Sequence, residues 1–375
     1  MRKKIVIILL LILFITMVVC VIKLSEKIDL LQTFIPEKIA VFKNVHMSGR
    51  ESDSSWEIFA QEGWTGRNRN ATTFEFVTKA EIDKNGRSLI KGLTARRLTI
   101  SRNKDIEIFR KIEEGHDGKQ YLHALIDFNA ISNKNRKRKF SSLAADNIKF
   151  NPSTKKALIT GDVKIVKDKM TIRSDRISLD LDNNIATFES RSSFIQKGSK
   201  LQANYATTNF DEDTMFMAGS IEVVQKNKTA TSDHATYDDR SKTIVLSSNV
   251  KAEIEKLKNM IKEESAEKIK GDETKKALQE KTVITCDKLK LSTEKGDCSA
   301  YGRVFVRQKE KEAKSEEAVY QEDSENITLT GNVYMKRKND WVKANKVIVS
   351  VDKETFEAIG KAETTFKVKK GSKRK

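Results

Sequence analysis

The stretch ADNIKFNPSTKKALITGDVKI, residues 145–165, contains the pattern on which the fold depends. A small residue is followed by a polar one, and apolar side chains then alternate with polar ones on either side of a turn. A glycine follows sixteen residues after the small residue, and the alternation continues beyond it. Period-two alternation predicts β-strands with one apolar face.

The same pattern occurs seven times between residues 139 and 368. The small residues that begin the copies are Ala145, Ser174, Ala203, Ser232, Cys286, Ser315 and Ala344. Successive copies begin 29 residues apart, except for one step of 54 residues after Ser232. Because a fixed period indicates a repeat architecture, we expect about two antiparallel strands per copy, stacked so that their apolar faces form one interior.

Two other positions keep the register. The polar residue after the small one is Asp146, Asp175, Asn204, Asp233, Asp287, Glu316 or Asn345. A glycine or serine lies fifteen residues further on, at Gly161, Ser190, Gly219, Ser248, Gly302, Gly331 and Gly360. Because the acidic or amide residue occurs once per copy, we interpret it as a structural hydrogen-bonding residue at a strand end and not as a catalytic one.

The apolar positions inside the copies are the candidate ligand-binding residues of a groove. They are Ile148, Phe150, Ile159, Ile177, Leu179, Phe188, Met215, Met217, Ile244, Leu246, Leu289, Leu291, Ile327, Leu329, Val347 and Val349. The alternative is that these side chains fill a closed core. Few aromatic residues (7%) and small residues on this face favour an unfilled interior; the small ones are Ala157, Ala186, Ala206, Ala235 and Ala300.

Residues 5–22 form an uncharged apolar run that follows a basic stub at residues 1–4. Eighteen helical residues span about 27 Å, which is enough to cross a bilayer core. We therefore expect a single-pass inner-membrane anchor with a cytoplasmic N-terminus and the bulk of the chain in a periplasm. A cleaved signal peptide is the alternative, but no typical cleavage site follows the run.

The remaining organisation follows from composition. After a linker at residues 23–36, residues 37–138 alternate like β-strands without the 29-residue step and are expected to form a first β domain. Residues 139–368 form the repeat domain, and the long step is explained by an insertion at residues 253–281 rich in helix-forming residues. Residues 369–375 are a basic tail for which we expect disorder.

The net charge of +18 suggests an anionic partner such as nucleic acid, anionic lipid or a phosphorylated glycolipid, although solubility alone would also explain it. The lysines are spread over polar strand faces and no nucleic-acid-binding motif is present, so we expect no nucleic-acid partner. No nucleotide-binding, hydrolase or metalloprotease motif occurs, and the four histidines lack metal-ligand spacing. We predict a non-enzyme with no cofactor and no metal site. The cysteines Cys286 and Cys298 occupy small or apolar positions and are interpreted as small hydrophobic residues.

Two segments resemble known proteins. The N-terminal run followed by Trp56-Glu-Ile-Phe-Ala60 resembles the membrane-anchored LptC component of lipopolysaccharide export. The repeats, such as Ala157-Leu-Ile-Thr-Gly-Asp-Val-Lys-Ile165 and Ile327-Thr-Leu-Thr-Gly-Asn-Val-Tyr-Met335, resemble the LptA/OstA-like periplasmic domain. This resemblance implies an all-β antiparallel β-jellyroll, or β-taco, whose apolar groove holds lipid acyl chains and whose protomers join end to end. The chain departs from the family by combining both kinds of domain and by its insertion.

These expectations combine into one leading hypothesis. The protein is expected to bind lipopolysaccharide or a related lipid and pass it toward the outer membrane, driven by a partner ABC transporter and joined to other OstA-like β-jellyroll proteins. Two alternatives are a structural β-solenoid stalk or adhesin with a closed core, and a carrier of another envelope lipid.

Overall fold

A computed structural model of the protein describes residues 38–51, 54–66, 70–84, 86–109, 122–127, 140–151, 153–167, 170–196, 198–225, 228–255, 280–321, 324, 326–350 and 355–365. In these residues every regular element is a β-strand, and no helix is long and apolar enough to cross a membrane. The predicted anchor at residues 5–22, the tail at residues 369–375 and most of the insertion at residues 253–281 lie outside them.

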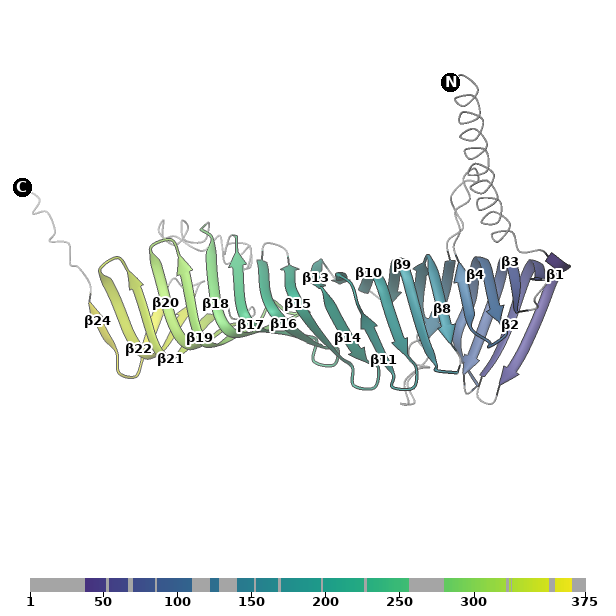
Figure 1. Cartoon of the computed structure of the whole chain (residues 1–375). Helices are drawn as coiled ribbons and strands as arrows, with labels where there is room; N and C mark the ends of the chain where they lie inside the picture. The colour runs from purple at the N-terminus through teal and green to yellow at the C-terminus, as the bar shows by residue number, and fades with distance from the viewer. Residues whose placement is uncertain are drawn as a thin grey trace, which may run out of the picture.

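The strands follow one another in an antiparallel order along an elongated body, with β1 at one end and β24 at the other (Figure 1). Six strands precede the first repeat, close to the alternating segments expected there. They are β1 (Lys38–Glu51), β2 (Ser54–Gly66), β3 (Ala71–Lys84), β4 (Arg87–Ser101), β5 (Ile106–Phe109) and β6 (Leu122–Asp127).

Around the first three repeats several strands are short, and two of these short strands pair with successive parts of one long strand. They are β7 (Phe140–Ala145), β8 (Asn147–Asn151), β11 (Ile185–Phe188), β12 (Ser192–Gln196), β13 (Ser199–Ala203) and β14 (Tyr205–Asn209). The long strands among them are β9 (Lys156–Lys167), β10 (Met170–Asp180) and β15 (Thr214–Gln225). β9 pairs with both β7 and β8, and β10 with both β11 and β12.

From β15 onward each long strand pairs with the next in chain order. The strands after β15 are β16 (Lys228–Asp238), β17 (Thr243–Ile254), β18 (Thr282–Ser292), β19 (Cys298–Gln308), β20 (Lys311–Gln321), β21 (Asn326–Arg337), β22 (Asp340–Ser350), β23 (Thr355–Ile359) and β24 (Glu363–Thr365). Ile254 pairs with Thr282, so the chain leaves for the insertion and returns from it at the same end of the sheet. The prediction of two antiparallel strands per 29-residue copy is confirmed.

The polar residue of each copy marks a bend in the sheet. Gly331 and Asn332 both have positive φ, 80° and 46°, and the pairing of β20 with β21 shifts register opposite them, around Glu316. A Cβ on Gly331 would lie 2.8 Å from the Cβ of Glu316, so only glycine fits this close approach. The bend recurs at the other copies and divides each long strand into two arms.

Side-chain bonds across the bend confirm a structural role for the polar residue. Asn332 donates to Glu316 over 2.6 Å, and Asn249 donates to Asp233 over 2.6 Å. The Arg303 guanidinium contacts both carboxylate oxygens of Asp287 and holds the pKa of that carboxyl below its usual range. The predicted location at a strand end is correct for Asp146 and Asn204, which separate short strands, whereas the other five copies place the residue within a continuous strand.

The two arms end in two rows of turns that lie on opposite sides of the interior. We call rim A the row of turns after β9, β12, β15, β17, β19 and β21, together with the β3–β4 turn. Rim B is the row of turns after β10, β14, β16, β18, β20 and β22. The strand registers place all rim A turns at one end of the strands and all rim B turns at the other.

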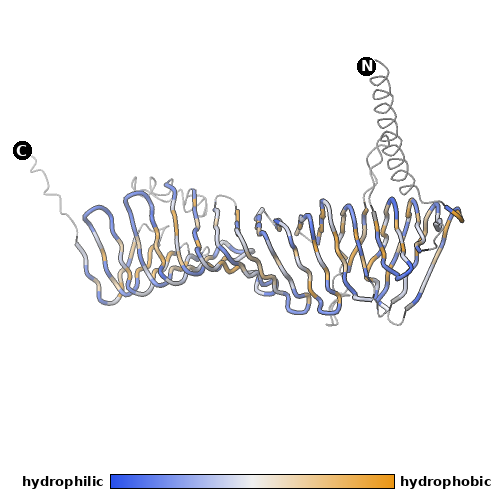
Figure 2. The backbone as a smooth tube through the Cα atoms, viewed as in Figure 1, coloured by the Kyte–Doolittle hydropathy of each residue, from blue (hydrophilic) through white to orange (hydrophobic). Residues whose placement is uncertain are grey.

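The interior consists of apolar side chains along the body, in two clusters of buried residues that both pack against Ala318. The small residue of every copy is buried, from Ala203 at 0% exposure to Cys286 and Ser315 at 8%. One cluster of buried residues runs from Ile58 to Val304, and a smaller one surrounds Val347. Figure 2 shows apolar and polar stretches alternating along the strands. The expected continuous apolar interior is therefore present.

The sheet also continues through the predicted domain boundary near residue 138. β5 pairs with β8, and β6 pairs with β7, so the first β segment and the first repeat share one sheet and one core. The division into domains at that point stays a prediction.

Candidate functional site: the apolar trough

The candidate site is the space between the two arms, which we call the trough. All sixteen predicted groove residues lie on its inner side, but they differ in accessibility. Eleven are buried, and the five half-buried ones are Phe150, Met215, Leu291, Ile327 and Val349. Most of the predicted residues are therefore buried, and several of the buried ones also border the cavities described below.

The middle of the trough, from β9 to β17, is well filled. Phe188 and Phe194 pack edge to face with ring centroids 5.4 Å apart, and Leu246 is fully buried. A cavity of about 300 Å³ remains there, and five predicted groove residues line it: Ile159, Ile177, Leu179, Phe188 and Met215. Ile148, Met217, Ile244, Leu246 and Val347 are buried in the core and line none of the cavities described here.

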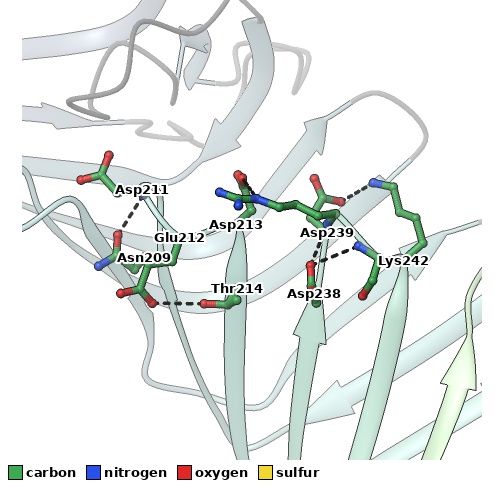
Figure 3. A network of polar contacts seen from close by, with 10 residues as sticks. Asn209, Asp211, Glu212, Asp213, Thr214, Asp238, Asp239 and Lys242 are labelled. Carbon is green, nitrogen blue, oxygen red and sulfur yellow. Dashed lines mark hydrogen bonds and ion pairs between the residues drawn. The ribbon is translucent and has the colours of Figure 1, made fainter.

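Polar residues on two rim B turns border this middle cavity. Figure 3 shows the turns after β14 and β16 side by side, with Asn209, Asp213, Asp239 and Lys242 at the cavity wall. Arg240 donates to Asp213 over 2.9 Å and so ties the two turns together. Lys242 Nζ lies 2.6 Å from Asp239.

Asp239 and Tyr237 form the inner part of this network. The Tyr237 hydroxyl donates to Asp239 over 2.9 Å. Burial opposes ionisation of Asp239, but the hydrogen bonds from Lys242 and Tyr237 and the charge of Lys167 outweigh it and lower the pKa of the carboxyl. Burial, followed by the bond to Asp239, raises the pKa of Tyr237. The network stabilises negative charge on rim B.

Rim A faces rim B in this part of the molecule, with one direct contact and one cavity that both rims line. The Lys84 ammonium donates to the carbonyl oxygen of Leu181 over 3.5 Å, although the residues are 97 positions apart. Lys167, at the β9–β10 turn, lines the same cavity as Asp239 on the opposite rim. Cationic side chains of rim A thus meet acceptors of rim B across the mouth of the trough.

The C-terminal trough, from β18 to β23, is open. A cavity of about 670 Å³ lies between its arms, and four predicted groove residues line it: Leu289, Ile327, Leu329 and Val349. Further apolar walls come from Ile284, Val306, Ala313, Met335 and Phe356. Phe356 is 52% exposed, so the cavity opens toward solvent beside an aromatic ring.

Polar groups in the C-terminal cavity are few and lie toward rim A. The Gln308 amide donates to Thr282 Oγ1 over 3.0 Å, which satisfies a buried pair at the cavity wall. Three cations, Lys311, Lys336 and Arg337, and two carboxylates, Glu312 and Asp340, lie at the mouth, beside the β19–β20 and β21–β22 turns. The wall itself offers apolar contact, and the charged groups are confined to one edge.

The two cysteines in the described residues are unpaired. Cys286 is buried, and burial raises the pKa of its thiol to about 11. Cys298 is half-buried, lines the C-terminal cavity and has a thiol pKa that burial raises. Both act as small apolar residues, as the sequence predicted.

Two further predicted groove residues line neither of these cavities, and two residues that line the C-terminal cavity were not predicted from the sequence. Leu291 packs half-buried against the core, and Phe150 lines a shallow polar hollow on the rim B side of β8 and β9. Lys311 and Arg337 were not among the predicted site residues. The signal for them was present, since they continue the inward parity of Ala313 and Met335 by one step. Within the described ranges, no group of three His, Cys, Asp or Glu residues could hold a metal ion.

The chain matches the model of one known protein family. The family model described as "LptA/(LptD N-terminal domain) LPS transport protein" matches residues 142–281 and 276–355. No curated protein matches the chain.

Two solved structures are similar at low identity. The periplasmic LptA homologue LptH from Pseudomonas aeruginosa is 9% identical, with 45% of this chain and 95% of that chain covered and a TM-score of 0.26. The WD40 domain of SCAP from fission yeast is 6% identical, with 89% and 92% covered and a TM-score of 0.12. Neither likeness is close enough to add to the assignment. The family match covers more than half of the 375 residues, and the chain therefore belongs to the LptA/LptD N-terminal domain family of lipopolysaccharide transport proteins.

Proposed function

We propose that the protein holds the acyl chains of lipopolysaccharide, or of a closely related lipid, in its C-terminal trough. The observation that carries the proposal is the cavity of about 670 Å³ with apolar walls in a member of this family. Burial of acyl carbon contributes ~0.8 kcal/mol per CH₂, so a chain of about a dozen carbons could contribute about 10 kcal/mol. The trough can therefore retain such a chain without any chemical step.

Release toward another membrane requires an energy source, because the same burial opposes it. No nucleotide-binding motif occurs in the sequence. We propose that a partner ABC transporter supplies this energy and that residues 5–22 anchor the protein in the inner membrane with its bulk in the periplasm. The apolar run and its basic flank support the anchor.

Joining to further β-jellyroll proteins is supported by the two free edges of the sheet. Among the described strands, β1 pairs only with β2, while β23 and β24 pair only with β22. Apolar side chains are exposed on both edges, with Phe42 at 59% and Phe356 at 52%. An unpaired edge strand can accept a strand from another chain, which would extend the trough from one protein to the next.

Photo-crosslinking in cells tests the lipid-binding proposal. A crosslinking residue at Met335, which lines the open cavity, should capture lipopolysaccharide. The adjacent position Tyr334 on β21 does not line the cavity and should capture little. Equal capture at the two positions, or none at Met335, would refute binding in the trough.

Mass spectrometry of lipid that co-purifies with the full chain identifies the ligand. Lipopolysaccharide is the expected species. A phospholipid in its place would favour a carrier of another envelope lipid, and an empty protein that yields no crosslinks would favour a structural stalk.

A further inference from the structure

The two rims of the trough differ in their numbers of basic and acidic residues. In the described turns that follow β9, rim A carries seven basic and four acidic residues, whereas rim B carries nine acidic and three basic residues. The acidic residues of rim B include Asp180, Asp211, Asp213, Asp239 and Asp297. The mouth of the trough therefore has a basic side and an acidic side.

In the middle of the molecule the two sides contact each other. Lys84 reaches the Leu181 carbonyl, and Lys167 lies across the cavity mouth from Asp239. The cations of rim A there face acceptors of the protein itself. A bound headgroup would have to displace these contacts to reach them.

The C-terminal trough differs on its rim B side in the residues that the structure describes. The described residues that line its cavity from that side are uncharged: Cys298, Tyr320, Ile327, Val349 and Phe356. Lys311 and Arg337 lie directly opposite each other on β20 and β21 at the other side of the mouth. Lys311 is half-buried, and no carboxylate of the described residues lies within ion-pair distance of it.

Neighbouring acidic residues have other partners. Glu312 pairs with Arg307 at 3.3 Å, and Glu310 pairs with Lys338 at 3.3 Å. Asp340 lies opposite Arg337 on β22, and each of these two residues makes an interaction within the protein. A half-buried ammonium beside an apolar wall is stabilised by an anion, and a charge-assisted hydrogen bond at such a site is stronger than one in bulk solvent. The edge of this apolar cavity carries three cations and two carboxylates, and one of the cations, Lys311, has no ion pair among the described residues. Such a cavity matches an amphiphile that has acyl chains and a phosphate group.

We infer that Lys311 and Arg337, with Lys336 beside them, form a phosphate-binding site for the headgroup of the lipid whose acyl chains occupy the C-terminal cavity. This inference rests on the proposed function and adds the orientation of the ligand. The headgroup lies on rim A and the acyl chains extend toward β22 and β23. Retention then depends on the phosphate as well as on acyl length.

The test uses the purified full chain and two probes, bisphosphorylated lipid A and the same lipid with its phosphates removed. The wild-type protein should bind the phosphorylated probe more tightly, and added salt should reduce that advantage. The double variant Lys311→Gln/Arg337→Gln should lose roughly tenfold or more in affinity for the phosphorylated probe, as expected for two charge-assisted contacts. Its affinity for the dephosphorylated probe should be unchanged.

Lys314→Gln is the matched control, because Lys314 lies on the same strand, is exposed and faces away from the cavity. It should leave both affinities unchanged. Equal affinity of the wild type for the two probes, or a double variant that keeps its preference for phosphate, would overturn the inference while leaving acyl binding intact. If the wild type binds neither probe, the proposed function itself fails.

Discussion

The middle of the trough, residues 145–254, and its C-terminal part, residues 282–359, have the same repeat and the same bend but different interiors. The middle positions large side chains inward, such as Phe188, Phe194 and Tyr237, and they are buried. Fourteen residues after the small residue of each copy, the middle carries Ile159, Phe188, Met217 and Leu246, whereas the C-terminal part carries Ala300, Leu329 and Ala358. Both regions keep one apolar face, and the smaller inward side chains at this position favour an open C-terminal trough. The comparison can be tested with parallel substitutions in the two regions.

Truncating one inward side chain in each region should give the largest difference. Leu246 has 0% exposure, so Leu246→Ala leaves a cavity and should reduce the free energy of unfolding by about 3 kcal/mol. Ile327 already borders open space, and Ile327→Ala should cost only about 1 kcal/mol. Chemical denaturation of both variants measures this. Equal losses would mean that the C-terminal cavity is packed in solution.

Replacing the glycine of the bend should reduce the free energy of unfolding by the same amount in both regions, because the geometry of the bend is the same. A methyl group at Gly161 would lie 2.7 Å from the Cβ of Asp146, and at Gly331 2.8 Å from the Cβ of Glu316. Gly161→Ala and Gly331→Ala should each destabilise by about 2 kcal/mol through backbone strain and this clash.

Gly198 provides the control for the bend. It has φ of 79°, but nothing lies near its missing side chain, so Gly198→Ala should cost about 1 kcal/mol from the backbone alone. The three variants can be compared by thermal unfolding. A loss at Gly161 no larger than that at Gly198 would show that the polar residue is free to move aside.

Enlarging a small inward residue should have opposite consequences in the two regions. Ala235 is 1% exposed, and Ala235→Leu should overpack the middle and destabilise it by about 1–2 kcal/mol. Ala313 lines the open cavity, so Ala313→Leu should be nearly neutral for stability and should weaken lipid binding. Unfolding and lipid-binding measurements on both variants separate filling from overpacking, and strong destabilisation by Ala313→Leu would contradict an open trough.

The smallest effect concerns pH at the junction of the two regions. Hydrogen bonds from Lys251 and Lys281 lower the pKa of Glu253 from 4.5 to about 2. The resulting stabilisation is present above pH 4.5 and is lost as the pH falls toward 2. The denaturation midpoint should therefore fall less between about pH 6 and about pH 3 in Glu253→Gln than in the wild type. High salt should reduce the difference, and an unchanged pH response in the variant would rule out this contribution.

Much of the fold could be predicted from the sequence because it is encoded locally. The alternation gives the inward face, and the 29-residue step gives strand pairing in chain order. The position of Glu316 opposite Gly331 follows from the same register. The buried position of Ala203 and its equivalents follows from the closeness of the two arms at the bend.

The openness of the trough could not be predicted in the same way. Period two places Leu246 and Ile327 on the same face, but one is core and the other borders a cavity. Their difference depends on the volumes of the side chains packed around them, which the alternation alone does not give. The contact between Lys84 and Leu181 is similarly non-local, since it joins the first β segment to the second copy.

The bend also determines how long the molecule can become. Each 29-residue copy brings its own glycine or serine at the bend, its own polar residue opposite and about two strands, and it contacts mainly its immediate neighbours along the axis. Adjacent strands lie about 4.8 Å apart, so one added copy would lengthen the body by roughly 10 Å. The length of such a protein therefore changes in steps of one copy. Duplicating one copy would extend the apolar trough without changes elsewhere in the sequence.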